Sequence, residues 1–372
     1  MRVSPLTPVA LLMLLPVCAS FAPQQHHIIH RGDSRRWTST KDSNNNKNDD
    51  GVWRQWANEY GIEAPKLSVR QPLDDERGKG GVHALESIAA LEVMMRVPRN
   101  LILATCDMPS RAAAAAAEAN EFSWAADLTA AALVVRYPDA DDNQDDTTAV
   151  VLGKKTWVEG WTDGGWATNG ADLGPPDVPW GAKSVTGSLL ATGSDNDHNI
   201  YAKFRFPCHP VIHRASLGLT VLTGANEDVT REALSCRGRN YRSMQDALFP
   251  LVTTPTERDS GSLRERRSWD VADMLSRVLS RATTLELDDA NDDDSAPTTY
   301  CVVPLHERLA HCATSSENSK LVACGDEVLL VAARDIEAGE AITRDYTTAP
   351  QLNDDTSDGA LRLLLQFGVP PM

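Results

Sequence analysis

The order of strand and helix signals along the chain constrains its fold most. Short runs of apolar and β-branched residues, broken by glycine and proline, occupy residues 78–105 and 300–369. Residues 108–137 and 267–286 between them carry helical signals, including an alanine run at 112–117. These signals predict short strands near both ends of the chain and helices between them.

The strands expected near the carboxyl end are short. They cover residues 300–303, 327–332 and 341–345, with a turn at Ala338-Gly339 and a short helix over residues 360–366. Ordered structure is expected to begin near Trp53, and Ser110 is expected to cap the first long helix.

The segment from residue 150 to residue 250 has the weakest pattern. Four tryptophans stand among glycines and prolines there, which predicts a loop-rich segment: Trp157, Trp161, Trp166 and Trp180. Strand-like runs follow at 201–206 and 217–222, and acidic, solvated loops are expected at 139–146 and 288–294. The sequence shows no internal repeat and no heptad pattern.

The net charge excludes one class of partner. The formal charge is −16, and residues 51–372 hold 30 Lys and Arg against 48 Asp and Glu. Nucleic-acid binding needs a basic face, so the charge argues against it. A basic protein surface or peptide is the charged partner that this composition favours.

The cysteines predict no disulfide framework. Seven are scattered along the chain and none forms a CxxC pair, so we expect reduced, buried thiols, although Cys312 and Cys324 could pair. Cys208-His209 with His213 offers two types of metal ligand, but structural zinc needs four ligands, so core packing is favoured and no metal site is assigned. No spacing supports a cysteine protease.

The first 50 residues are typical of a targeting sequence. Arg2, an apolar run at 8–17 and small residues at 18–20 predict a signal peptide, residues 1–20, that leaves no membrane anchor after cleavage. The following Phe21-Ala22-Pro23 resembles the bipartite plastid-targeting motif of algae with secondary plastids, and residues 21–50 are polar, as in a transit peptide or a disordered linker. Plastid localisation is therefore predicted, with secretion as the alternative.

Four separated segments carry a family resemblance. The first runs Lys79-Gly80-Gly81-Val82-His83-Ala84-Leu85-Glu86-Ser87-Ile88 and continues to Val97-Pro98-Arg99-Asn100-Leu101, and the second is Ser280-Arg281-Ala282. The third joins Val303-Pro304-Leu305-His306-Glu307-Arg308-Leu309-Ala310-His311-Cys312 to Ala332-Ala333-Arg334-Asp335-Ile336-Glu337-Ala338-Gly339-Glu340-Ala341-Ile342-Thr343-Arg344-Asp345-Tyr346, and the fourth is Gln366-Phe367-Gly368-Val369. In this order they resemble SET-domain protein methyltransferases of the Rubisco large-subunit and actin-histidine methyltransferase class.

The resemblance implies a fold and a domain organisation. It implies an α+β SET fold over residues 53–369, with short antiparallel sheets, a pseudoknot-like carboxyl end and a helical, loop-rich insertion at about residues 110–270. The chain stops soon after Val369, so we expect it to lack the helical substrate-binding domain that follows in the Rubisco enzyme.

The resemblance also implies S-adenosyl-L-methionine as cofactor and names the site residues. Tyr346 matches the catalytic tyrosine, whose hydroxyl aligns the substrate amine, although it could be an ordinary strand-end tyrosine. The residues matched to the cofactor site are Gly81, Arg281, Glu307, Ala310, His311, Phe367 and Gly368. Gly81 could equally be a turn glycine, a bare helix-end Arg281 would be solvated, and His311 is expected to be structural.

Two departures leave the activity open. Ala310 stands where the family has an asparagine that reaches the cofactor, and the lost hydrogen bonds cost about 1–3 kcal/mol. Phe367 replaces a tyrosine, and the acidic loop at 347–359 could cover the substrate entrance or simply be solvated. One hypothesis is a protein-lysine N-methyltransferase, lysine being favoured over histidine, acting on a basic segment of a plastid protein such as the Rubisco large subunit. The other is a catalytically inactive SET-like interaction module.

Overall fold

The computed structural model describes residues 50–70, 81–119, 123–138, 149–162, 208, 210–253, 261–287, 298–312, 317–367 and 369. These residues all lie in one unit, Asn44–Met372. The two targeting segments, the run at 201–206, the two acidic loops, Lys79, Trp166, Trp180 and Gly368 lie outside the described residues. Among the described helices, none combines the length and the apolar character that crossing a bilayer requires.

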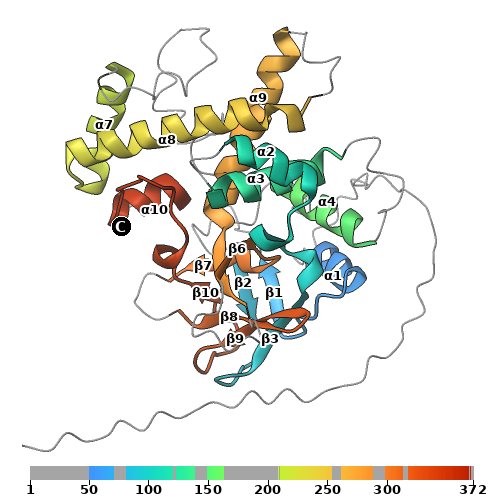
Figure 1. The fold of residues 1–372 in the computed structure, drawn as a ribbon. Coiled ribbons are helices and arrows are strands. Elements are labelled where there is room, and N and C mark those ends of the chain that lie inside the picture. The colour runs from blue at the N-terminus through green and yellow to red at the C-terminus, as the bar shows by residue number, and fades with distance from the viewer. Residues whose placement is uncertain are drawn as a thin grey trace, which may run out of the picture. The chain divides into compact units, whose positions relative to one another are not determined.

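Four small sheets gather at one end of this unit, and most of the helices gather at the other (Figure 1). Three are antiparallel: β1 (Leu67–Arg70) with β2 (Gly81–Ala84), β3 (Val93–Pro98) with β9 (Glu327–Ala332) and β8 (Ser319–Cys324), and β4 (Leu103–Ala104) with β6 (Thr298–Val302) and β5 (Thr283–Glu286). The fourth pairs β7 (Ala310–His311) with β10 (Thr343–Arg344) in parallel. The predicted α+β class is confirmed.

The two ends of the described chain are joined through backbone contacts. Ile88 and Ile336 form an antiparallel bridge, and the Ile342 N–H donates to the Val82 carbonyl at 2.8 Å. The β3–β9 pairing adds a full ladder between residues more than 200 positions apart. Strands that are too short to stand alone are therefore stabilised by partners distant in sequence.

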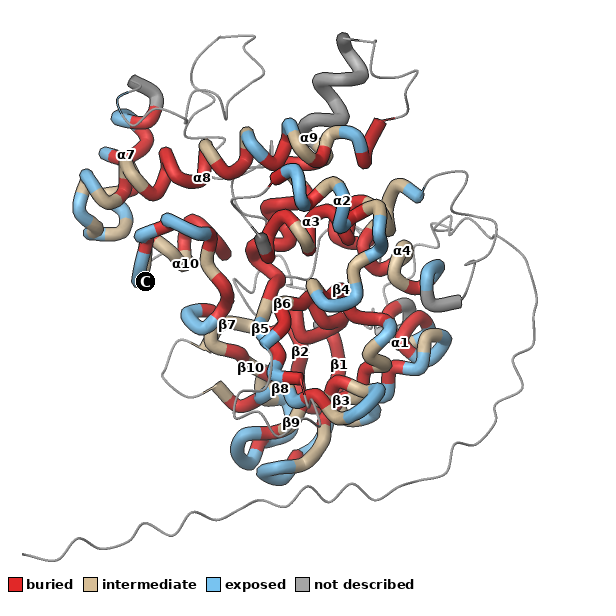
Figure 2. The backbone as a smooth tube through the Cα atoms, in the orientation of Figure 1, coloured by how far each residue is buried: buried red, intermediate tan, exposed pale blue. Residues whose placement is uncertain are grey.

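The helices are α1 (Asp50–Glu59), α2 (Ser110–Glu118), α3 (Ser123–Arg136), α4 (Ala149–Thr162), α7 (Pro210–Thr223), α8 (Glu227–Leu248), α9 (Gly261–Arg281) and α10 (Gly359–Phe367). Short 3₁₀ turns occur at Arg99–Leu101, Thr105–Asp107, Phe249–Leu251, His306–Arg308 (η5) and Tyr346–Thr348 (η6). Alanine-rich α3 is buried along most of its length and contacts α2, α4 and α9 (Figure 2). Its small side chains allow this close approach on several faces.

The sequence located many of these elements. The strand expected at 327–332 is β9 itself, and those at 300–303 and 341–345 and the last helix are confirmed within two residues at each end. The helical segment at 108–137 is confirmed as two helices, and order begins close to Trp53. Ser110 is the first residue of α2 and makes no capping hydrogen bond, so that prediction is wrong.

Three expectations for the middle of the chain are wrong. Residues 217–222 lie in helix α7 rather than in a strand. Trp157 and Trp161 lie in helix α4, not in a loop, four positions apart on one buried face. The helix expected at 267–286 ends at Arg281, and its last part is strand β5, which pairs with β6.

The described cysteines form no disulfide with one another, so Cys312 and Cys324 do not pair.

Candidate functional site

The segment from Leu305 to His311 is where the separated motifs meet. Leu305 has a φ of 66° and turns the chain into η5, after which β7 pairs with β10 in parallel. In that pair Ala310 lies opposite Thr343, and His311 lies opposite Arg344. Tyr346, two residues beyond β10, is thereby brought against the segment.

Tyr346 is fixed on three sides. Its hydroxyl donates to the Leu309 carbonyl at 2.7 Å, and its backbone N–H donates to His311 Nδ1 at 3.3 Å. The His311 ring stacks on it at a centroid distance of 5.0 Å, and the Phe367 ring stacks at 4.4 Å. Burial raises the pKa of the Tyr346 hydroxyl, so it stays protonated at neutral pH.

Gly81 supports the same segment from β2. Its φ is +115°, a conformation that residues with a side chain rarely adopt, and an added Cβ would lie 3.3 Å from the Arg308 carbonyl oxygen. The glycine is buried, so its backbone faces η5 rather than a solvated turn. Both the conformation and the close approach require glycine here.

Arg281, the last residue of α9, is fully buried, so the expectation that a bare helix-end arginine is solvated does not apply. Its Nη1 donates to the Arg277 carbonyl at 3.3 Å and to Ser280 Oγ at 3.0 Å. The guanidinium carbon lies 5.5 Å from the centroid of the Trp161 ring, within cation–π range.

Glu307 in η5 is also fully buried. Its Oε1 accepts a hydrogen bond from the Trp157 indole N–H at 2.9 Å and lies 3.5 Å from Arg308 Nε. Its Oε2 has no hydrogen-bond partner among the described residues. Burial raises the pKa of the Glu307 carboxyl, while the charges of Arg308 and Arg281 and the Trp157 N–H oppose that rise.

Arg344 is a site residue that the motif comparison did not single out. Its guanidinium donates to the carbonyls of Ser280, Arg281 and Ala282 at 3.1–3.5 Å and so caps the end of α9. Its guanidinium carbon also lies 4.9 Å from the centre of the Tyr346 ring. The sequence signal was its place in the run that leads to Tyr346, but its partners are about 60 residues away in the chain.

The remaining candidates differ in exposure. Ala310 and His311 are half-buried, and Phe367 is fully buried. Ala310 contributes only backbone atoms to the β7–β10 pair, and no side-chain hydroxyl or amide replaces the missing asparagine at that position. Burial lowers the pKa of the His311 ring, and Asp345 partly offsets this.

Two cavities occur among the described residues. One of about 240 Å³ is lined by β5, β8 and the start of η6, including His306, Arg344 and Asp345. The other, of about 270 Å³, lies at the end of α1 beside Trp53. Gly81, Arg281 and Glu307 line neither cavity, and all three are buried.

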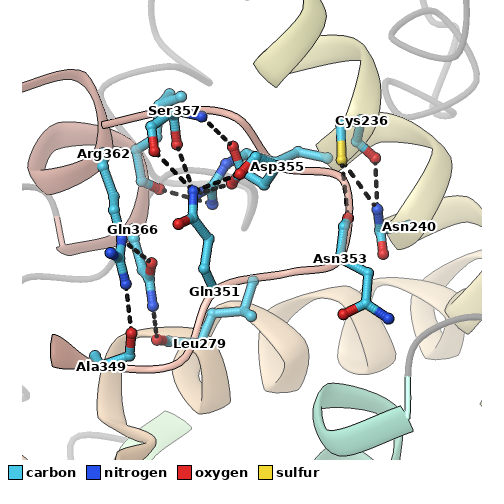
Figure 3. A network of polar contacts seen from close by, with 12 residues as sticks. Cys236, Asn240, Leu279, Ala349, Gln351, Asn353, Asp355, Ser357, Arg362 and Gln366 are labelled. Atoms are coloured by element: carbon cyan, nitrogen blue, oxygen red, sulfur yellow. Dashed lines mark hydrogen bonds and ion pairs between the residues drawn. The ribbon is translucent and has the colours of Figure 1, made fainter. Parts of the chain in front are cut away.

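The segment at 349–357, which we call the strap, is held down on α8, α9 and α10 rather than solvated (Figure 3). Asp355 forms an ion pair with Arg237 at 2.6 Å, with almost no side-chain exposure on either partner. Gln351 Nε2 donates to the Asp355 and Ser357 carbonyls, and Cys236 Sγ donates to the Asn353 carbonyl. The expectation of an acidic solvated loop is therefore wrong for Asp355, although Asp354 and Asp358 are exposed.

Comparisons with known proteins give limited information. No family model matches the chain, and no curated protein matches it. Among solved structures, the SET domain of LSMT bound to lysine and AdoHcy has a TM-score of 0.45 at 15% identity and covers 87% of this chain and 57% of that chain. Rubisco LSMT bound to sinefungin and monomethyllysine has a TM-score of 0.42 at 12% identity, and the match covers 87% of this chain and 56% of that chain. The chain thus spans less than two thirds of these proteins, and TM-scores below 0.5 lend the SET assignment no weight of their own.

Proposed function

We propose that the chain is a SET-type protein-lysine N-methyltransferase that uses S-adenosyl-L-methionine. The observation that carries the proposal is the position of Tyr346, whose hydroxyl meets the Leu309 carbonyl while β7–β10 and Gly81 hold the same segment. Gly81 and Tyr346 both approach the segment at 305–311. Arg344 joins the third motif to residues 280–282, and Phe367 of the fourth motif stacks on Tyr346. A chance resemblance would not require such convergence.

The residues present suit the cofactor chemically. Arg281 offers a guanidinium for a carboxylate, and Oε2 of Glu307 is buried without a hydrogen-bond partner among the described residues. Ala310 provides no polar side chain, so the backbone of β7 would have to substitute for it. When bound, the cofactor supplies an electrophilic methyl group for an in-line displacement.

The chain's own residues would align the acceptor amine. The Tyr346 hydroxyl oxygen and the Leu309 carbonyl oxygen are 2.7 Å apart and offer adjacent acceptors for a substrate N–H. A lysine amine has an ordinary pKa near ~10.4, so it must lose a proton before it reacts. Burial among Tyr346, Phe367 and the rings beside them favours the neutral amine by desolvation.

We propose a basic segment of a plastid protein, such as the Rubisco large subunit, as the substrate. The net charge of −16 favours a basic partner. The signal-like segment at 1–20 and the polar segment at 21–50 support import into an algal plastid. Fusion of residues 1–50 to a fluorescent protein in an alga with secondary plastids tests the predicted plastid localisation. Fluorescence outside the plastid would favour secretion.

Replacement of Tyr346 by phenylalanine tests the catalytic assignment. Calorimetric titration of residues 44–372 with S-adenosylmethionine is expected to show micromolar binding, and Tyr346→Phe is expected to keep it within a few-fold. Methyl transfer to plastid extract should fall by about 10²-fold, because the amine loses an orienting group. Tyr137→Phe is the matched control, since its hydroxyl donates to Asp270 outside the site. Equal activity of Tyr346→Phe and wild type would refute the assignment.

The second candidate, an interaction module without catalysis, rests on a specific observation. Arg281 and Glu307 contact Trp161 and Trp157, and Ala310 lacks the amide that the family uses. If millimolar S-adenosylmethionine does not bind, this candidate replaces the first, and a pull-down from plastid extract becomes the next step.

A further inference from the structure

Helix α4 places two tryptophans on the two charged residues matched to the cofactor. The Trp157 indole N–H donates to Glu307 Oε1 at 2.9 Å, and the Trp161 ring lies 5.5 Å from the Arg281 guanidinium carbon. The two indoles contact each other edge to face at 5.1 Å. Both are almost completely buried, as are Glu307 and Arg281.

In this arrangement two indole rings of the chain itself contact the carboxylate of Glu307 and the guanidinium of Arg281. An indole is a flat heteroaromatic ring with one N–H donor, and both its face and its donor are used here. A nucleoside group offers the same two features, a flat ring and polar hydrogens. The tryptophans thus occupy, from within the chain, one side of each of the two charged groups that the proposed cofactor would contact.

Helix α4 supplies no residue of the four motifs, and it contacts α3 and α9 as well as α1. Its Gly153 carbonyl accepts from the Trp56 indole N–H at 3.3 Å, and its Trp161 carbonyl accepts from Arg277. An added Cβ at Gly153 would meet the Tyr60 ring at 2.5 Å, so the helix rests directly on α1. Its opposite side is exposed at Val151 and Leu152.

We propose that α4 is a gate that keeps the cofactor site closed through Trp157 and Trp161. The inference rests on the proposed function and concerns the regulation of the same site. Glu307 and Arg281 have no solvent exposure, and each contacts one indole of α4, so withdrawal of the two indoles would uncover one side of each charged group. Cofactor binding then competes with the closed state, and its apparent affinity is reduced by the fraction of molecules that are closed.

Hydrogen exchange tests the gate without the cofactor. If α4 opens locally, its amides at 153–161 exchange with protection at least about a hundredfold lower than those of α3, which is buried in the same core. Equal protection of α4 and α3 would mean that α4 opens only when the whole protein unfolds. That result would overturn the gate, whether or not the cofactor binds.

Binding to tryptophan variants tests the coupling. Trp157→Phe removes one hydrogen bond of the closed state and is expected to bind S-adenosylmethionine about tenfold more tightly than wild type. Trp124→Phe is the matched control, because its indole N–H donates to the Gln351 carbonyl at 3.1 Å from helix α3, and its affinity should stay within twofold. Cofactor should also lower the protection of α4 in wild type.

The outcomes separate the two proposals. Binding to wild type with unchanged α4 protection and equal affinity in Trp157→Phe would overturn the gate and leave the methyltransferase proposal intact. No binding to wild type, Trp157→Phe or Trp161→Ala would overturn the cofactor function and with it the gate. Binding to the variants but not to wild type would support both.

Discussion

Arg237 and Asp355 show what a single buried charge can contribute to this fold. Their side chains are 2% and 0% exposed, so removal of one partner leaves the other charge buried. We expect Arg237→Met to lower the free energy of unfolding by about 3–5 kcal/mol. The same helix offers a control in Arg239, whose pair with Glu232 is 40% and 46% exposed and whose replacement by Met should cost less than about 1 kcal/mol.

Chemical denaturation of the two variants measures the difference. A similar loss of stability in Arg237→Met and Arg239→Met would contradict the assignment of the strap as a buried anchor.

His306 predicts a dependence of stability on pH. Burial, and to a smaller degree the charge of Arg344, holds the pKa of its ring well below 6.5. The unfolded chain therefore binds a proton below pH 6.5 that the folded chain does not, so this contribution to stability is complete above 6.5 and is lost as the pH falls. His311, with its pKa also lowered, acts in the same direction, whereas Glu307, with its pKa raised, acts in the opposite one.

Denaturation of wild type and His306→Gln at a series of pH values isolates this group. As the pH falls from 7.5 to 5, the free energy of unfolding of wild type should fall relative to that of His306→Gln. A difference that does not change with pH would show that His306 is protonated equally in both states.

At this scale the sequence located residues whose roles are local. Tyr346 and Gly81 belong to contiguous motifs, and both pack against the segment at 305–311. Trp157 and Arg344 were missed because their roles depend on Glu307 and on the end of α9, which are distant in sequence. A pairwise contact between distant residues leaves no trace in one sequence.

Among the elements, α8 has the best-defined helix start. Asn226 Oδ1 accepts from the backbone N–H groups of Asp228 and Val229 at 2.8 and 3.4 Å. Asn226→Ala should lower the free energy of unfolding by about 1 kcal/mol, while Asn226→Asp, which keeps an acceptor, should stay within about 0.5 kcal/mol of wild type. Thermal denaturation of the two variants is the measurement, and equal losses would mean that the cap does not stabilise α8.

Elements were predicted where their pattern was long or alternating. Strand β9 was predicted at its observed bounds, Glu327–Ala332, where an apolar run follows Gly325-Asp326. Residues 217–222 form too short an apolar run to distinguish a strand from a helix, and they lie in α7. Residues 283–286 extend the helical pattern of α9, but pairing with β6 makes them a strand, since tertiary contacts override local propensity.

For the whole molecule, the family resemblance implied the α+β class, whereas the packing of the two chain ends on each other and of the middle of the chain came from the structure. One core cluster runs from Trp53 through α3, α4, α8 and α9 to Leu365. A smaller cluster of Tyr346, Ala349 and Phe367 completes it near the carboxyl end. The tryptophans of α4 belong to the large cluster, which is why a glycine-rich stretch became a buried helix.

The parallel pair β7–β10 has a consequence for the order of folding during synthesis. Gly81 and β7 leave the ribosome well before β10 and Tyr346, and the pair cannot form until residues 343–346 are outside the exit tunnel. The helices and the β1–β2 hairpin can be made earlier, but the crossing at 305–311 remains open until the last few dozen residues emerge. Contacts between segments far apart in sequence form slowly, so this crossing is expected to close late in folding.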